Sequence, residues 1–261
     1  MGTLKKNELI LKSSTEFPCS YIKGRSEKRI FVNIPKNKSG NEVISKLTQK
    51  GFRRNYDHMY IPSCQNCISC ISLRLNISKF IYSKSNKRNL KTNADLSLVE
   101  NKFYSEKRFK LFKQYCRVRH SDGQMRYMTQ SDFINFFHKS KNKVKIFDLI
   151  NLNKELYGSI LLDVLEDGYS AVYSFFDPYS HKRGLGKNLI LKIIQKLKEK
   201  KKSHLYLGYW VRESKNMNYK SSFNNVEYFV NGESVHIVAR APHCFTSGNL
   251  MLTSLIKLPE K

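Results

Sequence analysis

Residues 145–211 carry the pattern that constrains the fold of this chain most strongly. Apolar and alternating runs predict four strands: residues 145–150, 156–165, 169–176 and 204–211. Asn151-Leu-Asn153 and Glu166-Asp-Gly168 separate the first three, and Asp-Gly is a strong hairpin signal. A strand meander, a helix and a returning strand together predict an α+β core.

The helix of this unit is expected to follow Gly184-Leu-Gly186. Its apolar side chains recur at helical spacing and predict one buried face: Leu185, Leu189, Ile190, Ile193, Ile194 and Leu197. Backbone N–H groups at a helix N-terminus attract anions, so a phosphate-bearing cosubstrate is one hypothesis for this loop. The coenzyme A motif of GNAT-type acyltransferases, Gln/Arg-x-x-Gly-x-Gly/Ala, fails here in both frames, and an ordinary glycine-rich helix entry is the alternative.

The N-terminal part of the chain has a different texture, since residues 14–80 hold four of the six cysteines and several turn signals. Period-two alternation predicts strands at residues 29–33 and 71–77. Helical spacing predicts three helices: residues 41–50 (ending at Gly51), 103–115, and 133–138, which Thr129-Gln-Ser-Asp132 opens.

The charge balance points to a polyanionic partner. The chain has 47 Lys and Arg against 21 Asp and Glu, a formal net charge of +26. Such an excess attracts nucleic acid or another anionic surface, although lysine-rich drift on a solvated surface is the alternative. Residues 78–120 are the most cationic stretch, with twelve basic and three acidic side chains.

Composition and hydropathy exclude two classes of protein. Disorder throughout is excluded because 40% of the residues are hydrophobic and 12% are aromatic. The sequence also lacks the apolar run of about 18 residues that a membrane helix needs, and its start lacks a secretory core. We therefore expect a cytoplasmic protein with no membrane partner, in which cysteines are ligands or buried thiols rather than disulfides.

The cysteine pattern predicts a candidate metal site. Cys64, Cys67 and Cys70 follow one another at spacings of three, so a tight loop can bring their sulfurs together. Tetrahedral zinc or an iron–sulfur cluster needs a fourth ligand, for which Cys19 is the candidate. The alternative is a set of buried cysteines that pack a small domain without metal.

Aromatic and polar side chains follow two of the predicted strands. Tyr173-Ser-Phe-Phe-Asp-Pro178 ends one strand, and the segment 207–220, which ends in Tyr219 and Lys220, holds the other. Adjacent strand ends of this kind suit a cleft between splayed strands. Core aromatics with solvated ends explain the same residues equally well.

Seven segments of the chain follow one another in a familiar order: Pro18–Arg25, Gly51-Phe-Arg-Arg54, Tyr60 with Pro62 and the cysteine triplet, Asn93–Leu96, Arg119–Met125, Tyr173–Pro178 and Leu207–Phe223. Taken in this order, they resemble the arginyl-tRNA–protein transferase family, and closely its bacterial branch of aspartate/glutamate leucyltransferases. The similarity covers about residues 14–233. Ile61 stands where the family has Arg, and Asn224-Asn-Val226 lacks a usual Pro.

The resemblance implies a fold and a division into domains. It implies a GNAT-like acyltransferase core, a mixed sheet with flanking helices, preceded by a cysteine-containing N-terminal domain. The expected ranges are an extension at 1–13, the N-terminal domain at 14–98, the GNAT-like domain at 99–233 and an unassigned tail at 234–261.

The resemblance also implies an activity. The family transfers an amino acid from aminoacyl-tRNA to the N-terminal Asp or Glu of a protein, which marks that protein for degradation by the N-end rule. The expected reaction here is leucyl transfer, with Leu-tRNA as cosubstrate and proteins that begin with Asp or Glu as partners. Two alternatives stay open: Arg-tRNA as the donor, and a non-catalytic basic RNA-binding protein with a structural metal.

Residue type and motif position suggest roles within this reaction. An acidic N-terminus demands a cationic clamp, and Arg forms the better fork for a carboxylate. The predicted catalytic residues are Tyr173, Asp177 (as ammonium holder or proton acceptor) and Lys220. The predicted substrate contacts are Arg25, Arg53, Arg54 and Tyr219, and the predicted tRNA contacts are Lys87, Arg88, Lys91 and Lys187.

Overall fold

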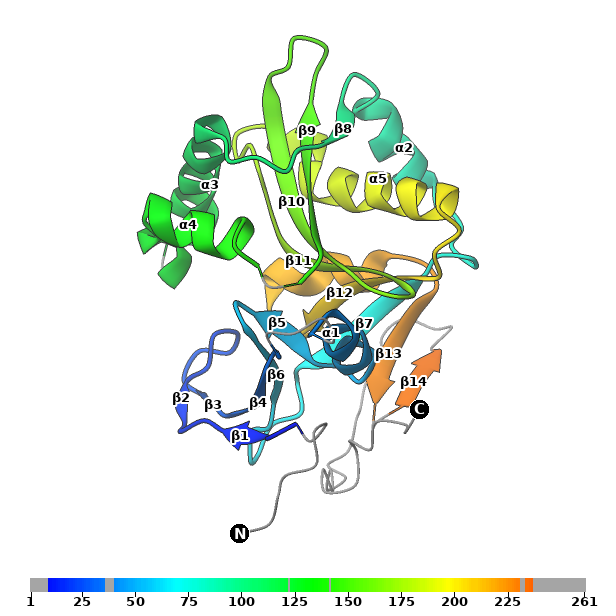
Figure 1. The fold of residues 1–261 in the computed structure, drawn as a ribbon. Helices are drawn as coiled ribbons and strands as arrows, with labels where there is room; N and C mark the ends of the chain where they lie inside the picture. Colours follow the sequence, from blue (N-terminus) through cyan, green and yellow to red (C-terminus); the bar gives the residue numbers. More distant parts are fainter. Residues whose placement is uncertain (1–8, 36–39, 122, 141, 231–232, 237–261) are drawn as a thin grey trace.

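The largest element of the computed structural model is an eight-stranded mixed sheet in the order β14-β13-β7-β12-β11-β10-β9-β8 (Figure 1). Its strands are β7 (Ile71–Asn76), β8 (Ser97–Glu100), β9 (Val144–Ile150), β10 (Leu156–Val164), β11 (Gly168–Phe176), β12 (His204–Trp210), β13 (Val226–Val230) and β14 (Glu233–His236). Strands β11 and β12 pair in parallel, and the other neighbours are antiparallel. The predicted α+β core with its meander and returning strand is therefore confirmed. The structure describes residues 9–35, 40–121, 123–140, 142–230 and 233–236.

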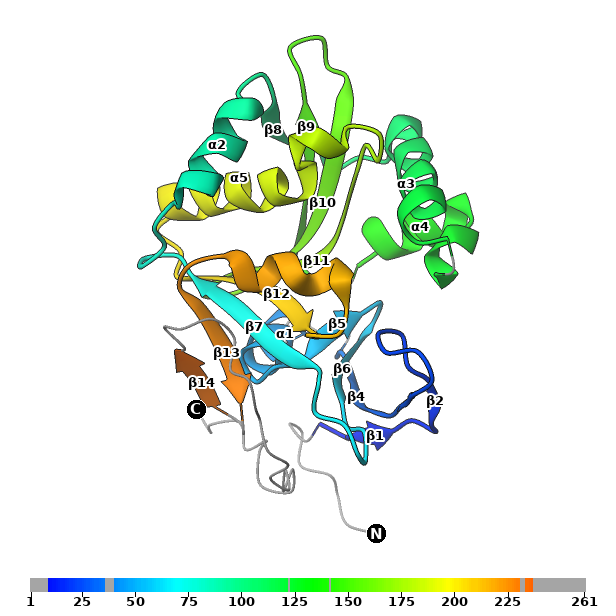
Figure 2. The same cartoon turned by 180° about the vertical axis from the view of Figure 1, so that it is seen from behind.

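Helices cover both faces of the β9–β11 half of the sheet (Figures 1 and 2). One face packs against α5 (Leu185–Glu199), on which α2 (Lys84–Thr92) lies, and the other against α3 (Glu106–Arg119) and α4 (Gln130–Phe137). Strand alternation explains this arrangement, because Ile160 and Leu162 of β10 belong to the core beneath α5 while Leu161 belongs to the aromatic core beneath α3 and α4. The apolar face predicted for the helix after Gly184 is buried in the first of these cores.

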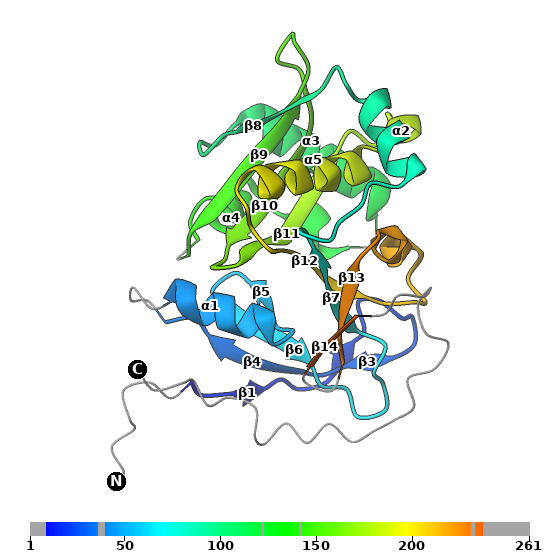
Figure 3. The same cartoon turned by 90° about the vertical axis from the view of Figure 1, so that its right-hand side faces the viewer.

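The N-terminal part forms smaller sheets below the main one (Figure 3). The four-stranded sheet has the order β1-β4-β6-β5, with strands β1 (Lys12–Ser13), β4 (Arg29–Asn33), β5 (Arg53–Asn55) and β6 (His58–Pro62), and β2 (Phe17–Pro18) pairs with β3 (Ser26–Glu27). Helix α1 (Gly40–Gln49) packs on the four-stranded sheet, and their core includes Leu165 and Tyr206 of the large sheet region. The chain leaves the helix through Gly51 at φ +88°, a conformation that favours glycine.

Two predicted helices differ from the observed ones at their starts. Helix α3 begins at Glu106 instead of residue 103, because the Ser105 side chain caps it by accepting from the Arg108 N–H, which leaves Phe103 outside and 82% exposed. Helix α4 begins at Gln130, earlier than predicted, because Thr129 and Asp132 form a reciprocal capping box.

The predicted domain division stays a prediction. Its boundary between residues 98 and 99 falls within β8. Strand β7 belongs to the predicted N-terminal domain, yet it lies between β12 and β13 in the large sheet. Residues 1–8 of the predicted extension and 237–261 of the predicted tail lie outside the described residues. Within the described ranges, no helix is long and apolar enough to cross a membrane.

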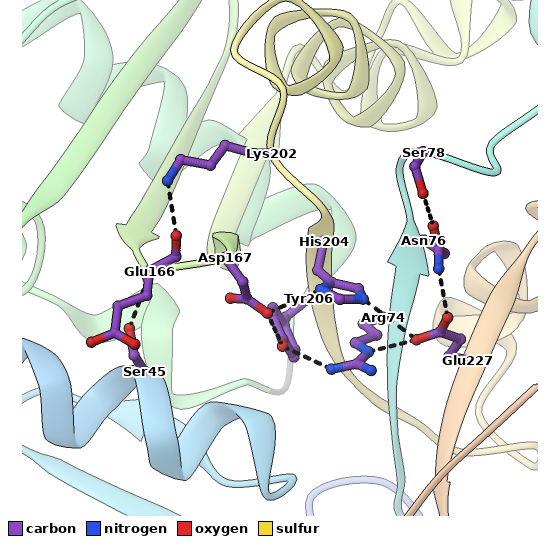
Figure 4. Close-up of polar contacts among 10 residues, drawn as sticks. All are labelled: Ser45, Arg74, Asn76, Ser78, Glu166, Asp167, Lys202, His204, Tyr206 and Glu227. Carbon is purple, nitrogen blue, oxygen red and sulfur yellow. Dashed lines mark hydrogen bonds and ion pairs between the residues drawn. The ribbon is translucent and has the colours of Figure 1, made fainter.

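A polar network joins the two parts of the molecule beside β7, β12 and β13 (Figure 4). His204 Nδ1 lies 2.9 Å from Asp167 Oδ2, and Tyr206 donates to the same oxygen at 2.7 Å. On the other side Arg74 Nε donates to Glu227 Oε2 at 2.7 Å, and Arg74 Nη1 donates to the Tyr206 hydroxyl. Nearby, the Glu166 N–H donates to Ser45 on α1, which ties α1 to the turn between β10 and β11.

This network predicts that the fold loses stability in acid. Burial alone would raise the pKa of both carboxyls, but donors outweigh it and lower the pKa of Asp167 (from His204 and Tyr206) and of Glu227 (from Asn76 and Arg74). Their stabilisation is therefore present above the unfolded-state pKa of about 4 and disappears as pH falls through the lower folded-state values. We expect Glu227→Gln to lower the free energy of unfolding by about 1–2 kcal/mol at neutral pH, with the difference from wild type shrinking below pH 4. Urea denaturation at both pH values measures this, and an equal difference at both would contradict it.

Candidate active site

The candidate active site lies where β11 and β12 separate. The two strands pair only through Gly168–Ser170 and His204–Tyr206, although both continue beyond these residues. Each strand carries a register shift just past the last pair, which leaves Val172 of β11 and Leu207 of β12 as extra residues. Bulges of this kind bend strands and re-aim side chains near active sites. A cavity of about 480 Å³ occupies this region, which is the cleft between splayed strands that the sequence suggested.

The walls of the cavity divide by chemistry. Its apolar lining comes from β11, α5, β12 and the following 3-10 segment (Lys215–Ser222): Ala171, Val172, Phe176, Pro178, Leu185, Ile190, Leu207 and Met217. Its basic lining residues are Arg53, Arg119, His120, His181, Lys187 and Lys220. Among the described residues that line the cavity there is no Asp or Glu.

Arg53 reaches the cavity from the small sheet. Because side chains alternate along β5, Arg53 and Arg54 point to opposite faces. Arg53 Nη2 donates to the Val172 carbonyl at 2.8 Å, so the bulge residue of β11 supplies its acceptor. On the other side Gly208, at φ +72°, leaves room for the guanidinium, since a Cβ there would lie 2.8 Å from Arg53 Nη1.

Lys220 brings a second cation to the same wall. Its side chain is 6% exposed, and its Nζ donates to the Tyr209 carbonyl at 2.6 Å. Burial, and then the charge of Arg53, hold the pKa of Lys220 well below its usual value. Among the residues that the structure describes, no carboxylate forms an ion pair with Arg53 or Lys220. Two basic groups without an acidic partner beside an apolar wall suit a ligand that carries an anionic group and an apolar group.

Tyr173 and Tyr219 also line the cavity, as the sequence suggested. The Tyr173 hydroxyl lies 3.7 Å from the Cys116 sulfur, and burial raises the pKa of this phenol well above its usual value. Tyr219 is 41% exposed at the opening beside Lys220. Both phenols are therefore hydroxyl groups that donate hydrogen bonds at neutral pH.

Three predicted site residues lie elsewhere among the described residues. Arg54 is buried in an ion pair with Asp163, with Nε 2.9 Å from Oδ1. Asp177 follows β11, but its carboxylate accepts from the Tyr179 N–H at 3.1 Å and from the Ser180 hydroxyl, and it does not line the cavity. Arg25 is exposed and contacts the Cys67 sulfur.

The four cysteines of the predicted metal site share one region. Burial, then the charges of Glu27 and of the thiols of Cys19, Cys64 and Cys67, raise the pKa of Cys70 to about 12. The thiol of Cys67 differs: burial would raise its pKa, but hydrogen bonds from Ser69 and Arg25 outweigh burial and lower it. Within the described part of the chain no three His, Cys, Asp or Glu side chains are arranged to hold a metal ion. The cysteines as placed do not fit a metal centre, and zinc or cluster binding stays a prediction.

The predicted tRNA contacts lie on α2 and on α5, against which α2 packs. Lys87, Arg88 and Lys91 are exposed on α2. Lys187 lines the cavity and donates to the Ser85 hydroxyl of α2 at 3.2 Å, so it connects the cavity with this helix. The sequence placed Lys187 on a predicted helix but predicted no helix for Lys87, Arg88 and Lys91, and in the structure α2 packs on α5.

Sequence reasoning missed several lining residues, notably Tyr115, Arg119 and His120 at the end of α3. His120 Nε2 lies 3.4 Å from the Tyr115 hydroxyl, and burial lowers the pKa of His120. A usable signal existed, because Arg119 and His120 begin one of the motifs quoted for the resemblance, and Tyr115 precedes Arg119 by one helical turn.

Family models and curated relatives agree on one family. Residues 17–88 match the family model described as "Arginine-tRNA-protein transferase, N terminus", and residues 107–230 match the corresponding C-terminus model. An aspartate/glutamate leucyltransferase of Saccharophagus degradans is 34% identical over 228 residues, covering 87% of this chain and 96% of that protein. An aspartate/glutamate leucyltransferase of Ruegeria pomeroyi is 35% identical over 217 residues, which cover 82% of this chain and 79% of that protein. Among solved structures, L-PGS from Bacillus licheniformis is 13% identical, with a TM-score of 0.43 over 55% of this chain and 47% of that one.

Proposed function

Since the chain belongs to the arginine-tRNA-protein transferase family, we propose that it transfers leucine from Leu-tRNA to the N-terminal Asp or Glu of proteins. It is an aminoacyltransferase that uses aminoacyl-tRNA as cosubstrate. The observation that carries the assignment of the site is the basic pair Arg53 and Lys220, which the described residues leave without an acidic partner. The side-chain carboxylate of the acceptor's first residue is the group that completes this pair.

The reaction is aminolysis of an ester. The lone pair of the acceptor's α-amino group attacks the leucyl carbonyl carbon, a C–N bond forms, and the ester C–O bond breaks. The tRNA leaves with a free hydroxyl, which takes up the proton that the amine loses. An α-amino group has a pKa of about 7.7–8.0, so roughly a tenth is already neutral at pH 7 and positioning can supply a large part of the acceleration.

Side chains in the cavity can assist both charge changes of this reaction. His120 is half-buried with a lowered pKa, so its neutral ring is able to accept the proton that the amine nitrogen loses after it has attacked. The hydroxyl of Tyr173 or Tyr219 can donate to the oxyanion that forms at the leucyl carbonyl. Asp177 supports this wall indirectly, by holding the turn that follows β11.

The lining of the cavity favours leucine over arginine as the donated residue. A leucyl side chain can bury itself against Leu185, Ile190 and Leu207, which form part of the apolar core beside α5. An arginyl side chain would enter a cavity that already holds Arg53 and Lys220 and whose described lining lacks an acidic partner. A GNAT-like core is consistent with the splayed pair β11 and β12 and with a donor other than coenzyme A.

A transfer assay tests the proposal and its two alternatives together. Purified protein is mixed with a Glu-initiated peptide and with tRNA charged with Leu or Arg, and the peptide mass is measured. We expect the peptide to gain one leucine residue. A gain of arginine would support the second donor, and tRNA retention without transfer would support a non-catalytic RNA-binding protein.

The lowered pKa of Lys220 predicts that KM for the acceptor peptide depends on pH. A carboxylate between Arg53 and Lys220 favours the protonated lysine, so the free enzyme must take up a proton to bind it at any pH above the lowered pKa of Lys220. We expect KM for a Glu-initiated peptide to rise with pH in that range. Lys220→Met should raise KM about tenfold at the low end of the range and remove this dependence.

Stability provides a second readout for the same lysine. Between the lowered folded-state pKa and the usual value of 10.5, the unfolded chain binds one more proton than the fold, so stability rises with pH. Lys220→Met should remove this slope and unfold at a higher urea concentration than wild type at pH 7. A less stable variant with an unchanged KM would contradict both expectations.

A further inference from the structure

An exposed aromatic side chain stands on the turn that follows β11. The Tyr179 ring is 64% exposed, and the described residues provide it with no ring contact. Its neighbours Pro178 and His181 line the cavity. The exposed Tyr179 ring therefore stands next to residues that line the cavity.

Hydrogen bonds hold the turn that carries Tyr179 at both of its ends. Asp177 accepts hydrogen bonds from the Tyr179 N–H and from the Ser180 hydroxyl. The Arg183 carbonyl, at the far end of the turn, accepts from the side-chain amides of Asn89 at 3.1 Å and of Asn93 at 2.8 Å. Asn89 belongs to α2 and Asn93 is its C-cap, so these bonds join the turn beside the cavity to the helix whose exposed residues include Lys87, Arg88 and Lys91.

We propose that the Tyr179 ring is the platform on which an unpaired base at the 3′ end of the donor tRNA stacks. The proposal rests on the proposed function and adds a nucleotide contact to it. A tRNA whose phosphates lie on α2 and whose ester lies in the cavity must pass its single-stranded end over this turn. Aromatic side chains bind such ends by stacking, and nearby cations such as Lys182 and Lys187 neutralise the phosphates.

The test compares intact tRNA with the same tRNA lacking its unpaired 3′ nucleotides. We expect Tyr179→Ala to weaken binding of intact tRNA by about 5- to 150-fold, the range for loss of one stacked base, and to leave binding of the truncated tRNA unchanged. Tyr179→Trp should retain the affinity for intact tRNA, because any large aromatic ring can stack. Phe103→Ala is the matched control, since Phe103 is 82% exposed at the other end of α3 from the cavity.

Each outcome supports or overturns the proposal. Equal affinity of Tyr179→Ala and wild type for intact tRNA would overturn it. It would also be overturned if Tyr179→Ala lost as much affinity for truncated tRNA as for intact tRNA, or if Phe103→Ala lost as much affinity for intact tRNA as Tyr179→Ala. Wild-type leucyl transfer, measured in parallel, separates this result from the function itself. Transfer by wild type with an unaffected Tyr179→Ala variant rejects the platform alone, whereas a wild type that neither transfers leucine nor binds tRNA rejects both.

Discussion

Replacing Arg53 by methionine is expected to lower kcat/KM for a Glu-initiated peptide about 100-fold, or about 2.7 kcal/mol, and to leave a Gln-initiated peptide unaffected. The reason is that the guanidinium, held between the Val172 carbonyl and Gly208, is the fork that a side-chain carboxylate meets at the cavity wall. A neutral amide gains little from that fork, so wild type should prefer Glu over Gln and the variant should not. Initial rates with the two peptides measure the preference.

Two further variants separate charge recognition from damage to the fold. Arg53→Lys keeps the charge but lacks the planar fork, so we expect an intermediate preference for Glu. Arg117→Met removes an exposed cation of α3 that does not line the cavity, and it should change both peptides equally. If Arg53→Met retains the full preference for Glu over Gln, Arg53 does not bind the acceptor's carboxylate.

Replacing the neighbouring Arg54 is expected to act on stability instead. Arg54 and Asp163 are each 1% exposed at the side chain, and Asn142 donates to the same carboxylate at 2.7 Å. Arg54→Met leaves that carboxylate buried without its charge partner, which should lower the free energy of unfolding by about 3–5 kcal/mol. Urea denaturation measures this, and kinetics below the transition should show an unchanged preference for Glu over Gln.

The double variant Arg54→Met, Asp163→Leu tests the cause of that loss. Because it removes both charges, it should recover much of the stability that Arg54→Met loses. Equal instability of the single and double variants would show that the arginine contributes through packing. A collapsed preference for Glu would instead return Arg54 to the acceptor site, the role that its motif first suggested.

These adjacent arginines show how far the sequence predicts the site. Gly51-Phe-Arg-Arg54 belongs to the family motif as a unit, so both arginines were predicted as substrate contacts. The period of a strand places them on opposite faces, but which face meets the cavity depends on how the small sheet packs against β11 and β12. Asp177 is a similar case. Its motif ends a strand at the cavity, but its carboxylate accepts a hydrogen bond from the Tyr179 N–H within the following turn.

Local signals were sufficient for part of the fold, although they predicted neither α2 nor the strands β13 and β14. The strands of the meander and the apolar face of α5 follow from periodicity between residues that are near in sequence, and they were predicted nearly to the residue. The starts of α3 and α4 were misplaced because the capping side chains of Ser105 and Thr129, not the apolar spacing, decide where a helix begins.

The sequence alone therefore determined the α+β class, the family and the basic character of the protein, because these depend on composition and on patterns between near neighbours. Only the tertiary structure decided which residues share a site. The cavity exists because β11 and β12 diverge after three paired residues, and Arg53 and Lys220 meet there from segments more than 160 positions apart. Bulge positions and sheet packing set that meeting through long-range contacts, and the spacing of residues along the chain carries no record of it.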